Sequence, residues 1–141
     1  MKVTGQRENK LSNVIELGAG LGRDSIYLGK NSINLTALDY SENGLKILDQ
    51  KIKNENLSSS ISTLKFDIRK NLPFENNQFD YIWSWGVIHH TTNTELAAEE
   101  IQRVMKKDGQ LDIMIYNNDS LYKLLNVYLR YGILKFKFFQ G

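Results

Sequence analysis

The sequence of 141 residues contains no cysteine and a single proline. Without cysteine the chain has no disulfide, no thiol nucleophile and no zinc–thiolate site, and this composition is compatible with a reducing compartment. The first residues lack the apolar segment of a signal peptide, and no run of about 18 apolar residues occurs anywhere. We therefore expect a cytoplasmic protein.

An excess of charge of one sign is also missing. The chain has 18 lysines and arginines against 16 aspartates and glutamates, a net charge of +2. Because the two signs are interspersed, the charge does not indicate a nucleic-acid partner. With 41% hydrophobic and 24% charged residues, the sequence is typical of a folded domain, and its length predicts one domain, residues 1–141, with one core.

Strand-like and helix-like segments alternate along the chain. Helices are predicted after the glycines near residue 20, after a cap at Ser41 and after a capping box formed by Thr92 and Glu95, with "KKDG" ending the third. Alternation with short connections predicts a parallel sheet covered on both faces, with the ligand beyond the carboxyl ends of its strands. The predicted strands are residues 13–17, 34–39, 61–67, 79–85 and 109–116.

Three glycines at alternate positions, Gly18, Gly20 and Gly22, follow the first predicted strand. Such a turn lets a nucleotide approach bare backbone and a helix N-terminus, and NAD, FAD, ATP and S-adenosylmethionine are all compatible with it. The dinucleotide pattern G-x-G-x-x-G is not met, because Arg23 stands where its third glycine belongs. No P-loop pattern is present. The turn therefore favours a nucleoside without a pyrophosphate.

An acid closes each of the first three predicted strands. Asp39 stands 21 positions after Gly18, a spacing at which a carboxylate accepts hydrogen bonds from ribose hydroxyls; the alternative is a cap of the next helix. Asp67 has the geometry to receive an exocyclic amine, or else forms an Asx-turn. Glu16 needs a partner at a buried strand end, either a ligand ammonium or a local backbone group.

Four segments together resemble the successive motifs of class I S-adenosylmethionine-dependent methyltransferases, and most closely their small-molecule, type 11-like branch. They are "VIELGAGLGRDSIYL", "LTALDYSENGL", "FDIRKNLPFENNQFDYIWSWGVIHH" and "EEIQRVMKKDGQLDIMIYN", within residues 12–117. The resemblance implies a Rossmann-like, doubly wound fold and S-adenosylmethionine as cofactor. It also assigns cofactor contacts to the strand ends. Around the methionine part it places Gly18, Ala19, Gly20 and Gly22, with Trp83 and Ser84 under the amino group. On the adenosine it places Asp39 at the ribose, Tyr40 against the adenine, Asp67 at the adenine amine, and Ile68 at the ring through its backbone.

The family's sheet has seven strands, whereas five are found here. We therefore expect a chain truncated at its C-terminus, with the final antiparallel hairpin missing and "LDIMIY" as an open, apolar edge that permits self-association. The basic, aromatic segment 118–141 is expected to be an amphipathic helix and tail covering the sheet. A lid, or a contact with a membrane surface through residues 120–139, is the less favoured alternative.

The leading functional hypothesis is methyl transfer to a small-molecule or lipid-like acceptor by in-line displacement. A non-catalytic cofactor-binding or scaffold domain is the alternative, and a nicotinamide-dependent oxidoreductase is a weaker one. His89 and His90 are candidate bases for the acceptor, or else pack against the following helix. Because adjacent side chains are expected to point in different directions, no metal site is predicted there.

Overall fold

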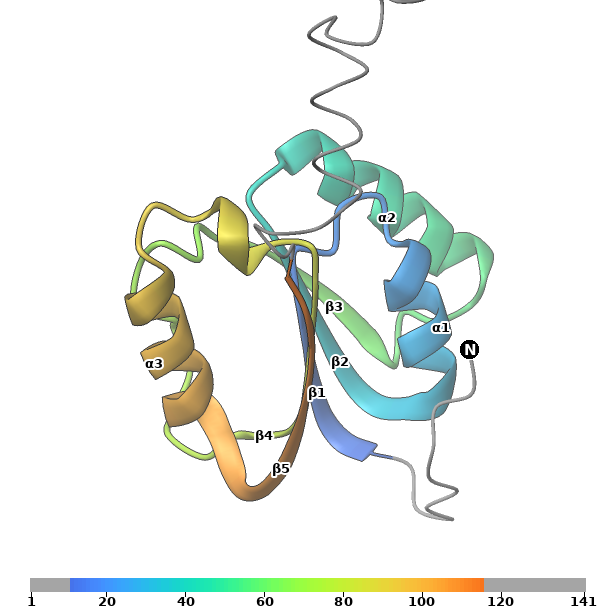
Figure 1. The fold of residues 1–141 in the computed structure, drawn as a ribbon. Helices are drawn as coiled ribbons and strands as arrows, with labels where there is room; N and C mark the ends of the chain where they lie inside the picture. The colour runs from blue at the N-terminus through green and yellow to red at the C-terminus, as the bar shows by residue number, and fades with distance from the viewer. Residues whose placement is uncertain (1–10, 116–141) are drawn as a thin grey trace, which may run out of the picture.

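The structure, a computed structural model, describes residues 11–115, in which parallel strands alternate with helices (Figure 1). Its helices are α1 (Arg23–Asn31), α2 (Glu42–Asn54) and α3 (Thr94–Val104), and a short 3₁₀ turn, η1, spans Ile88–His90. Its strands are β1 (Leu11–Leu17), β2 (Ser32–Asp39), β3 (Ile61–Lys65), β4 (Phe79–Trp85) and β5 (Met105–Met114).

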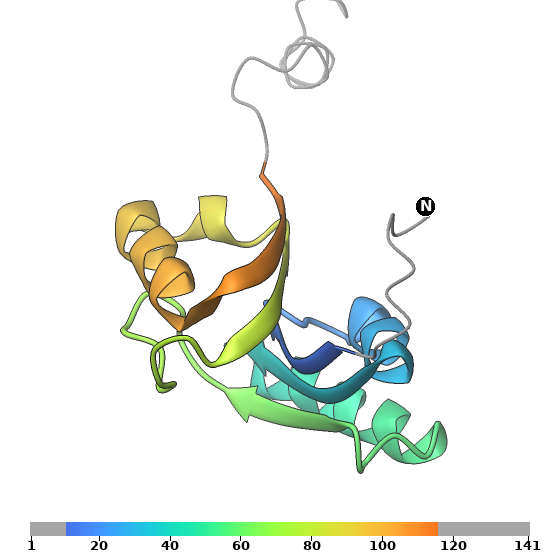
Figure 2. The same ribbon diagram turned by 90° about the horizontal axis from the view of Figure 1, so that it is seen from below.

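The strands form one sheet in the order β3-β2-β1-β4-β5, and every pairing is parallel. The chain runs from β1 outward to β3 and then returns to the other side of β1 to form β4. Helices α1 and α2 cover one face and α3 covers the other (Figures 1 and 2). The order thus reverses beside β1, and a crevice at such a reversal is where open α/β sheets bind ligands. The predicted doubly wound fold is confirmed.

Two apolar clusters hold the helices against the sheet. On one face, Leu45, Leu48 and Ile52 of α2 join a cluster with residues of β2 and β3. They recur at helical spacing, so one stripe of α2 meets the sheet. On the other face, α3 packs on β1 and β4 through Ala97, Ile101 and Val104.

The predicted boundaries of α3 are wrong at both ends. Its N-cap is Asn93, whose side chain accepts a hydrogen bond from the N–H of Leu96, so the expected capping box at Thr92 is not formed. The helix ends at Val104, before "KKDG". The carbonyl of Val104 accepts from the N–H of Gln78, which draws the chain into the sheet. Residues 106–109 then form an irregularity inside β5, because successive partners on β5 jump from Met105 to Gln110.

Other expectations fall outside residues 11–115, including the amphipathic segment 118–141 and the end of the fifth predicted strand. Within the described part of the chain, no helix has the length and apolar character needed to cross a membrane. Ser41 caps α2 as predicted, with its hydroxyl oxygen accepting from the N–H of Gly44 at 3.1 Å.

In the described residues, β5 pairs with β4 alone and forms one edge of the sheet (Figure 2). Ile113 near its end has 42% of its surface exposed. Such an edge offers unpaired N–H and C=O groups beside apolar side chains, which favours pairing with a second copy. We expect the 141-residue chain to self-associate, and Ile113→Lys to shift its mass by light scattering toward the monomer value of 16.3 kDa.

Ile47 of α2 is the matched control, because it is also 42% exposed but lies on a helix. Ile47→Lys should leave the association unchanged. A monodisperse monomer for the unmodified chain, or an equal effect of both substitutions, would contradict association through β5.

Candidate functional site

The glycine turn joins the end of β1 to α1 and is bonded to β2. The N–H groups of Gly18 and Ala19 both donate to the carbonyl of Leu38, at 2.8 and 3.0 Å. From the other side, Lys51 Nζ of α2 donates to the carbonyl of Leu21 at 2.7 Å. These contacts fix the backbone of the turn at the carboxyl edge of the sheet.

Asp39, the last residue of β2, holds the middle of this turn. Its Oδ2 accepts the N–H of Gly20 at 2.7 Å, and its Oδ1 accepts the N–H of Ser41 at 2.7 Å. A carboxylate has about four lone-pair positions, so each oxygen keeps one for a further donor. The helix cap itself is Ser41, and Asp39 therefore acts on the turn and on the residue before α2.

The three glycines have different surroundings, although all three have positive φ. A Cβ at Gly18 would collide with Val87, and a Cβ at Gly22 would collide with Leu48. At Gly20, with φ of 55°, no described atom outside Gly20 and its two chain neighbours lies within 4 Å of that position. Gly18 and Gly22 thus allow close packing, whereas Gly20 borders open space beside Asp39.

Glu16 is buried beneath the turn, with 3% of its surface exposed. It accepts a short hydrogen bond from the hydroxyl of Ser25 on α1. Burial raises the pKa of Glu16 from 4.5 to about 7, and the Ser25 hydrogen bond opposes that rise. The partner is therefore a side chain of α1, and the alternative of a local backbone partner is not what the structure shows. Near neutral pH this carboxyl is poised between its two protonation states.

Arg69 brings together two of the predicted adenine contacts, Tyr40 and Asp67. It donates to both oxygens of Asp67, with Nη2 to Oδ2 at 2.7 Å, and hydrogen bonds to Arg69 lower the pKa of Asp67 to about 2. Its guanidinium carbon lies 5.9 Å from the centroid of the Tyr40 ring, which is 67% exposed. Ile68 packs its side chain toward the core on the α3 face.

Trp83 and Ser84 lie near the end of β4 on opposite faces of the sheet. Trp83 is next to Glu16 across the β1–β4 pairing and packs on the α1–α2 side, stacked on Trp85 with ring centroids 5.1 Å apart. Ser84 is fully buried beside Leu17. Within residues 11–115, the indole Nε1 of Trp83 and the hydroxyl of Ser84 have no hydrogen-bond partner. Only Trp83 therefore shares a face with Glu16.

His89 and His90 belong to the 3₁₀ turn η1 after β4. Their rings lie 4.0 Å apart between centroids, tilted by 50°. The expectation that the two side chains point in different directions is therefore wrong, because the tight turn places both rings together. Burial, and then the neighbouring His90, lower the pKa of His89. Among the residues that the structure describes, no group of three His, Cys, Asp or Glu could hold a metal ion.

The structure thus gathers Glu16, the glycine turn, Asp39 and Trp83 at one edge, with Tyr40 and Asp67 joined through Arg69. The sequence reasoning missed Ser25 and Arg69, and it missed an ion pair of α3, Glu100 with Arg103. A signal for that pair was present, because Glu100 falls between Ala97 and Ile101 on the apolar stripe of the helix.

Residues 15–113 match the family model described as a methyltransferase domain. The demethylmenaquinone methyltransferase of Listeria welshimeri is 31% identical over 140 residues, which are 94% of this chain and 58% of that protein. An uncharacterized protein of Methanocaldococcus jannaschii is 33% identical over 116 residues, 82% of this chain and 46% of that protein. The chain spans about half the length of the curated relatives it matches.

Solved structures show the same fold. A putative S-adenosyl-L-methionine-dependent methyltransferase of Methanococcus maripaludis superposes with a TM-score of 0.69 at 25% identity, over 89% of this chain and 59% of that one. The PH0226 protein of Pyrococcus horikoshii gives 0.71 at 23% identity, over 86% and 57% of the two chains. The fold is also that of the [4+2]-cyclase SpnF, with a TM-score of 0.68 at 24% identity, over 72% of this chain and 37% of that one.

The buried Glu16 makes stability depend on pH. Its pKa is higher in the folded chain than the unfolded value of 4.5, so the folded state holds the extra proton between about pH 4.5 and 7. The free energy of unfolding therefore falls as pH rises through this window, by about 3 kcal/mol. Glu16→Gln keeps the shape and an acceptor for Ser25 but cannot ionise, so it should remove this part of the pH dependence.

Urea unfolding of both proteins at pH 4.5 and pH 8 measures the difference. Glu99→Gln, an exposed acid on α3, is the control and should follow the unmodified chain. Parallel pH profiles for Glu16→Gln and the unmodified chain would show that Glu16 ionises normally.

Proposed function

The chain belongs to the class I S-adenosylmethionine-dependent methyltransferases, and on that premise we propose that it binds S-adenosylmethionine and transfers its methyl group to a small-molecule or lipid-like acceptor. The observation that carries the proposal is the open space at Gly20, bordered by the free lone pairs of Asp39. The cofactor supplies a methyl group on a sulfonium, which is ready for in-line displacement.

At the methionine end, the turn at Gly18, Ala19, Gly20 and Gly22 would surround the cofactor, with Glu16 and Trp83 beneath it. The buried carboxyl of Glu16 suits an ammonium group, because a bound cation favours its ionised form. The indole Nε1 of Trp83, a buried donor with no partner in residues 11–115, suits an acceptor atom of the ligand. Ser84 lies on the other face of the sheet, so we propose that it packs inside the core and makes no direct contact with the cofactor.

At the adenosine end, Asp39 would accept from the ribose hydroxyls and Tyr40 would lie against the adenine. Ile68, whose side chain packs toward the core, would meet the ring through its backbone. The three hydrogen bonds from the Arg69 side chain already occupy the carboxylate of Asp67. An adenine amine that reaches Asp67 must therefore share this carboxylate with Arg69 or displace it.

For the acceptor, the relatives named demethylmenaquinone methyltransferases support a lipid-like candidate. The stacked indoles of Trp83 and Trp85 offer an apolar surface at the carboxyl end of β4. His89 and His90 follow that strand and are candidate bases if the acceptor atom carries a proton. We also propose a cytoplasmic location, which the lack of cysteine favours.

A non-catalytic cofactor-binding domain is the second candidate, because the fold also occurs in a protein named as a cyclase, so the fold alone does not specify methyl transfer. Incubation with S-adenosylmethionine and demethylmenaquinone separates the two. Formation of S-adenosylhomocysteine in proportion to the acceptor supports the transferase, whereas binding without turnover on any acceptor supports the second candidate. Calorimetry with NADH tests the nicotinamide alternative and should show no binding.

Asp39→Ala should weaken S-adenosylmethionine binding at least about tenfold, because it removes a charge-assisted acceptor and releases Gly20. Isothermal titration calorimetry measures the Kd. The control is Asp49→Ala, which removes the carboxylate that accepts from Thr63 at 2.8 Å between α2 and β3. It should lose stability but keep its affinity.

In the same titration, Gly20→Val should abolish binding, since its side chain would fill the open space and strain a positive φ. For the Asp39→Ala variant described above, unchanged affinity in a folded protein would contradict the assignment of Asp39 to the ribose hydroxyls.

The two histidines give a prediction about chemistry as distinct from binding. His89→Gln and His90→Gln should each keep the affinity for S-adenosylmethionine within about twofold, because η1 lies beyond β4 and not on the glycine turn. Turnover should change little if they only pack. A hundredfold loss of turnover, with binding retained, would identify the changed residue as a general base.

A further inference from the structure

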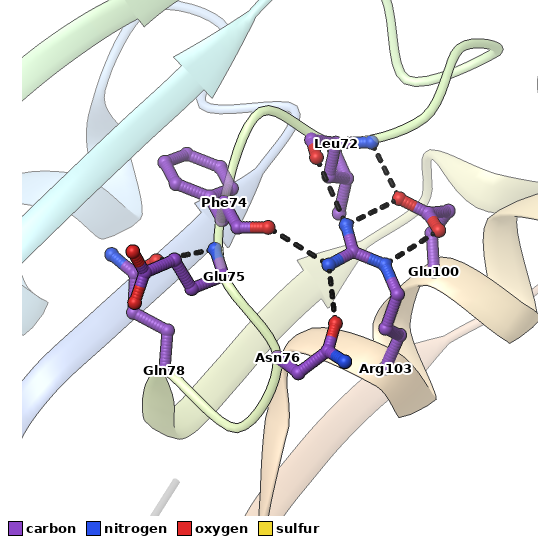
Figure 3. A network of polar contacts seen from close by, with 7 residues as sticks. All are labelled: Leu72, Phe74, Glu75, Asn76, Gln78, Glu100 and Arg103. Atoms are coloured by element: carbon purple, nitrogen blue, oxygen red, sulfur yellow. Dashed lines mark hydrogen bonds and ion pairs between the residues drawn. The ribbon is translucent and has the colours of Figure 1, made fainter.

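The loop from residue 66 to residue 78 joins β3 to β4 and carries Asp67 and Ile68, the proposed adenine contacts. The structure assigns no helix to this crossover, so its shape depends on what holds it from outside. Figure 3 shows that the loop is tied to α3 by Glu100 and Arg103.

Arg103 uses all five of its N–H donors in this contact. Nη1 donates to the carbonyl of Phe74 at 2.8 Å and to Oδ1 of Asn76 at 2.9 Å. Nη2 donates to the carbonyl of Leu72 at 2.9 Å and to Glu100 at 2.7 Å, and Nε donates to Glu100 at 2.8 Å. A lysine has one nitrogen and cannot reproduce this planar fork.

Glu100 completes the contact from the same helix. Its side chain is 8% exposed, and its Oε2 accepts the N–H of Leu72 at 2.6 Å. Leu72 is thus held through both its N–H and its carbonyl, by two side chains 28 and 31 residues away. Such a satisfied, partly buried polar network favours one arrangement of the loop, because another arrangement leaves the buried carboxylate of Glu100 without these partners.

Leu72, which Glu100 and Arg103 hold, lies only a few residues after Asp67 in the same loop. The N–H of Lys70 donates to the carbonyl of Asp67 at 3.0 Å, which closes a turn between them. Ile68 and Leu72 line a small cavity together with Leu17, Ile88 and Glu100. Leu72 therefore lies beside Ile68 at this cavity and close in the chain to the turn that begins at Asp67.

We propose that Arg103 and Glu100 are positioning residues for the cofactor: through Leu72 they hold the β3–β4 loop so that Asp67 and Ile68 meet the adenine. The proposal rests on the proposed function, because it gives the loop an adenine to contact. It adds to the site two residues of α3 that touch no part of the cofactor themselves.

The test compares Arg103→Lys with a control of matched burial. Lys106 pairs with Asp80 at 2.7 Å near the amino end of β4, and its side chain is 34% exposed against 31% for Arg103. Arg103→Lys and Glu100→Gln should each raise the Kd for S-adenosylmethionine about tenfold. Lys106→Gln should lower the melting temperature without changing the Kd.

Three further readouts separate positioning from general stability. The affinity for 5′-methylthioadenosine, which keeps the adenosine part, should fall by the same factor in Arg103→Lys. The effect should also be smaller in a chain that already carries Asp67→Asn, because both changes act at the adenine. Amide exchange at Ile68 and Leu72 should quicken in Arg103→Lys even without ligand.

The outcomes are distinguishable. An unmodified chain that binds no S-adenosylmethionine rejects the proposed function, and this inference with it. Normal binding by Arg103→Lys, or an effect fully additive with Asp67→Asn, overturns the inference alone. If Arg103→Lys does not fold, Glu100→Gln decides between these results.

Discussion

The structure depends on one carboxylate, that of Asp39, which accepts the N–H of Gly20 and the N–H of Ser41 at once. The first belongs to the turn after β1 and the second to the residue that caps α2. A single side chain thereby fixes the end of one strand, the turn beside it and the start of the next helix. Both bonds go to backbone N–H groups, which must be satisfied wherever the chain turns away from regular structure.

Around this point, three acids at neighbouring strand ends have three electrostatic environments. Glu16 is buried against Ser25, and its pKa rises to about 7. Asp67 is paired with Arg69, and its pKa falls to about 2. Asp39 lies between them with lone pairs left for a donor. Desolvation at Glu16 and ion pairing at Asp67 therefore shift the pKa of a carboxyl group in opposite directions along a single sheet edge.

The two faces of the sheet carry different parts of the candidate site. The α1–α2 side carries Glu16 and Trp83, close to where the glycine turn opens. The α3 side carries the contact of Glu100 and Arg103 with the loop that follows β3. A ligand at the reversal of strand order would therefore meet residues that are supported from both sides of the sheet.

The sequence alone determined the order of strands and helices, the glycine turn, the Ser41 cap and the presence of an acid at or just after the ends of the first three strands. These features follow local rules: buried runs, helical spacing and turn residues lie within a few positions of one another. The assignment of cofactor contacts to these residues stays a prediction. The predicted bounds of α3 were wrong for two reasons. Asn93 caps the helix in place of Thr92, and the chain pairs with β4 directly after Val104.

Tertiary structure alone decided which glycine borders open space, because only the contacts of Val87 and Leu48 distinguish Gly18 and Gly22 from Gly20. Tertiary structure also sets the protonation of Glu16, because burial raises the pKa of its carboxyl and no sequence pattern specifies that burial. It paired Arg103 with Leu72 across 31 residues. Such partners are brought together by the packing of elements that are distant in the chain. The residues next to each partner in the sequence therefore do not predict the pairing.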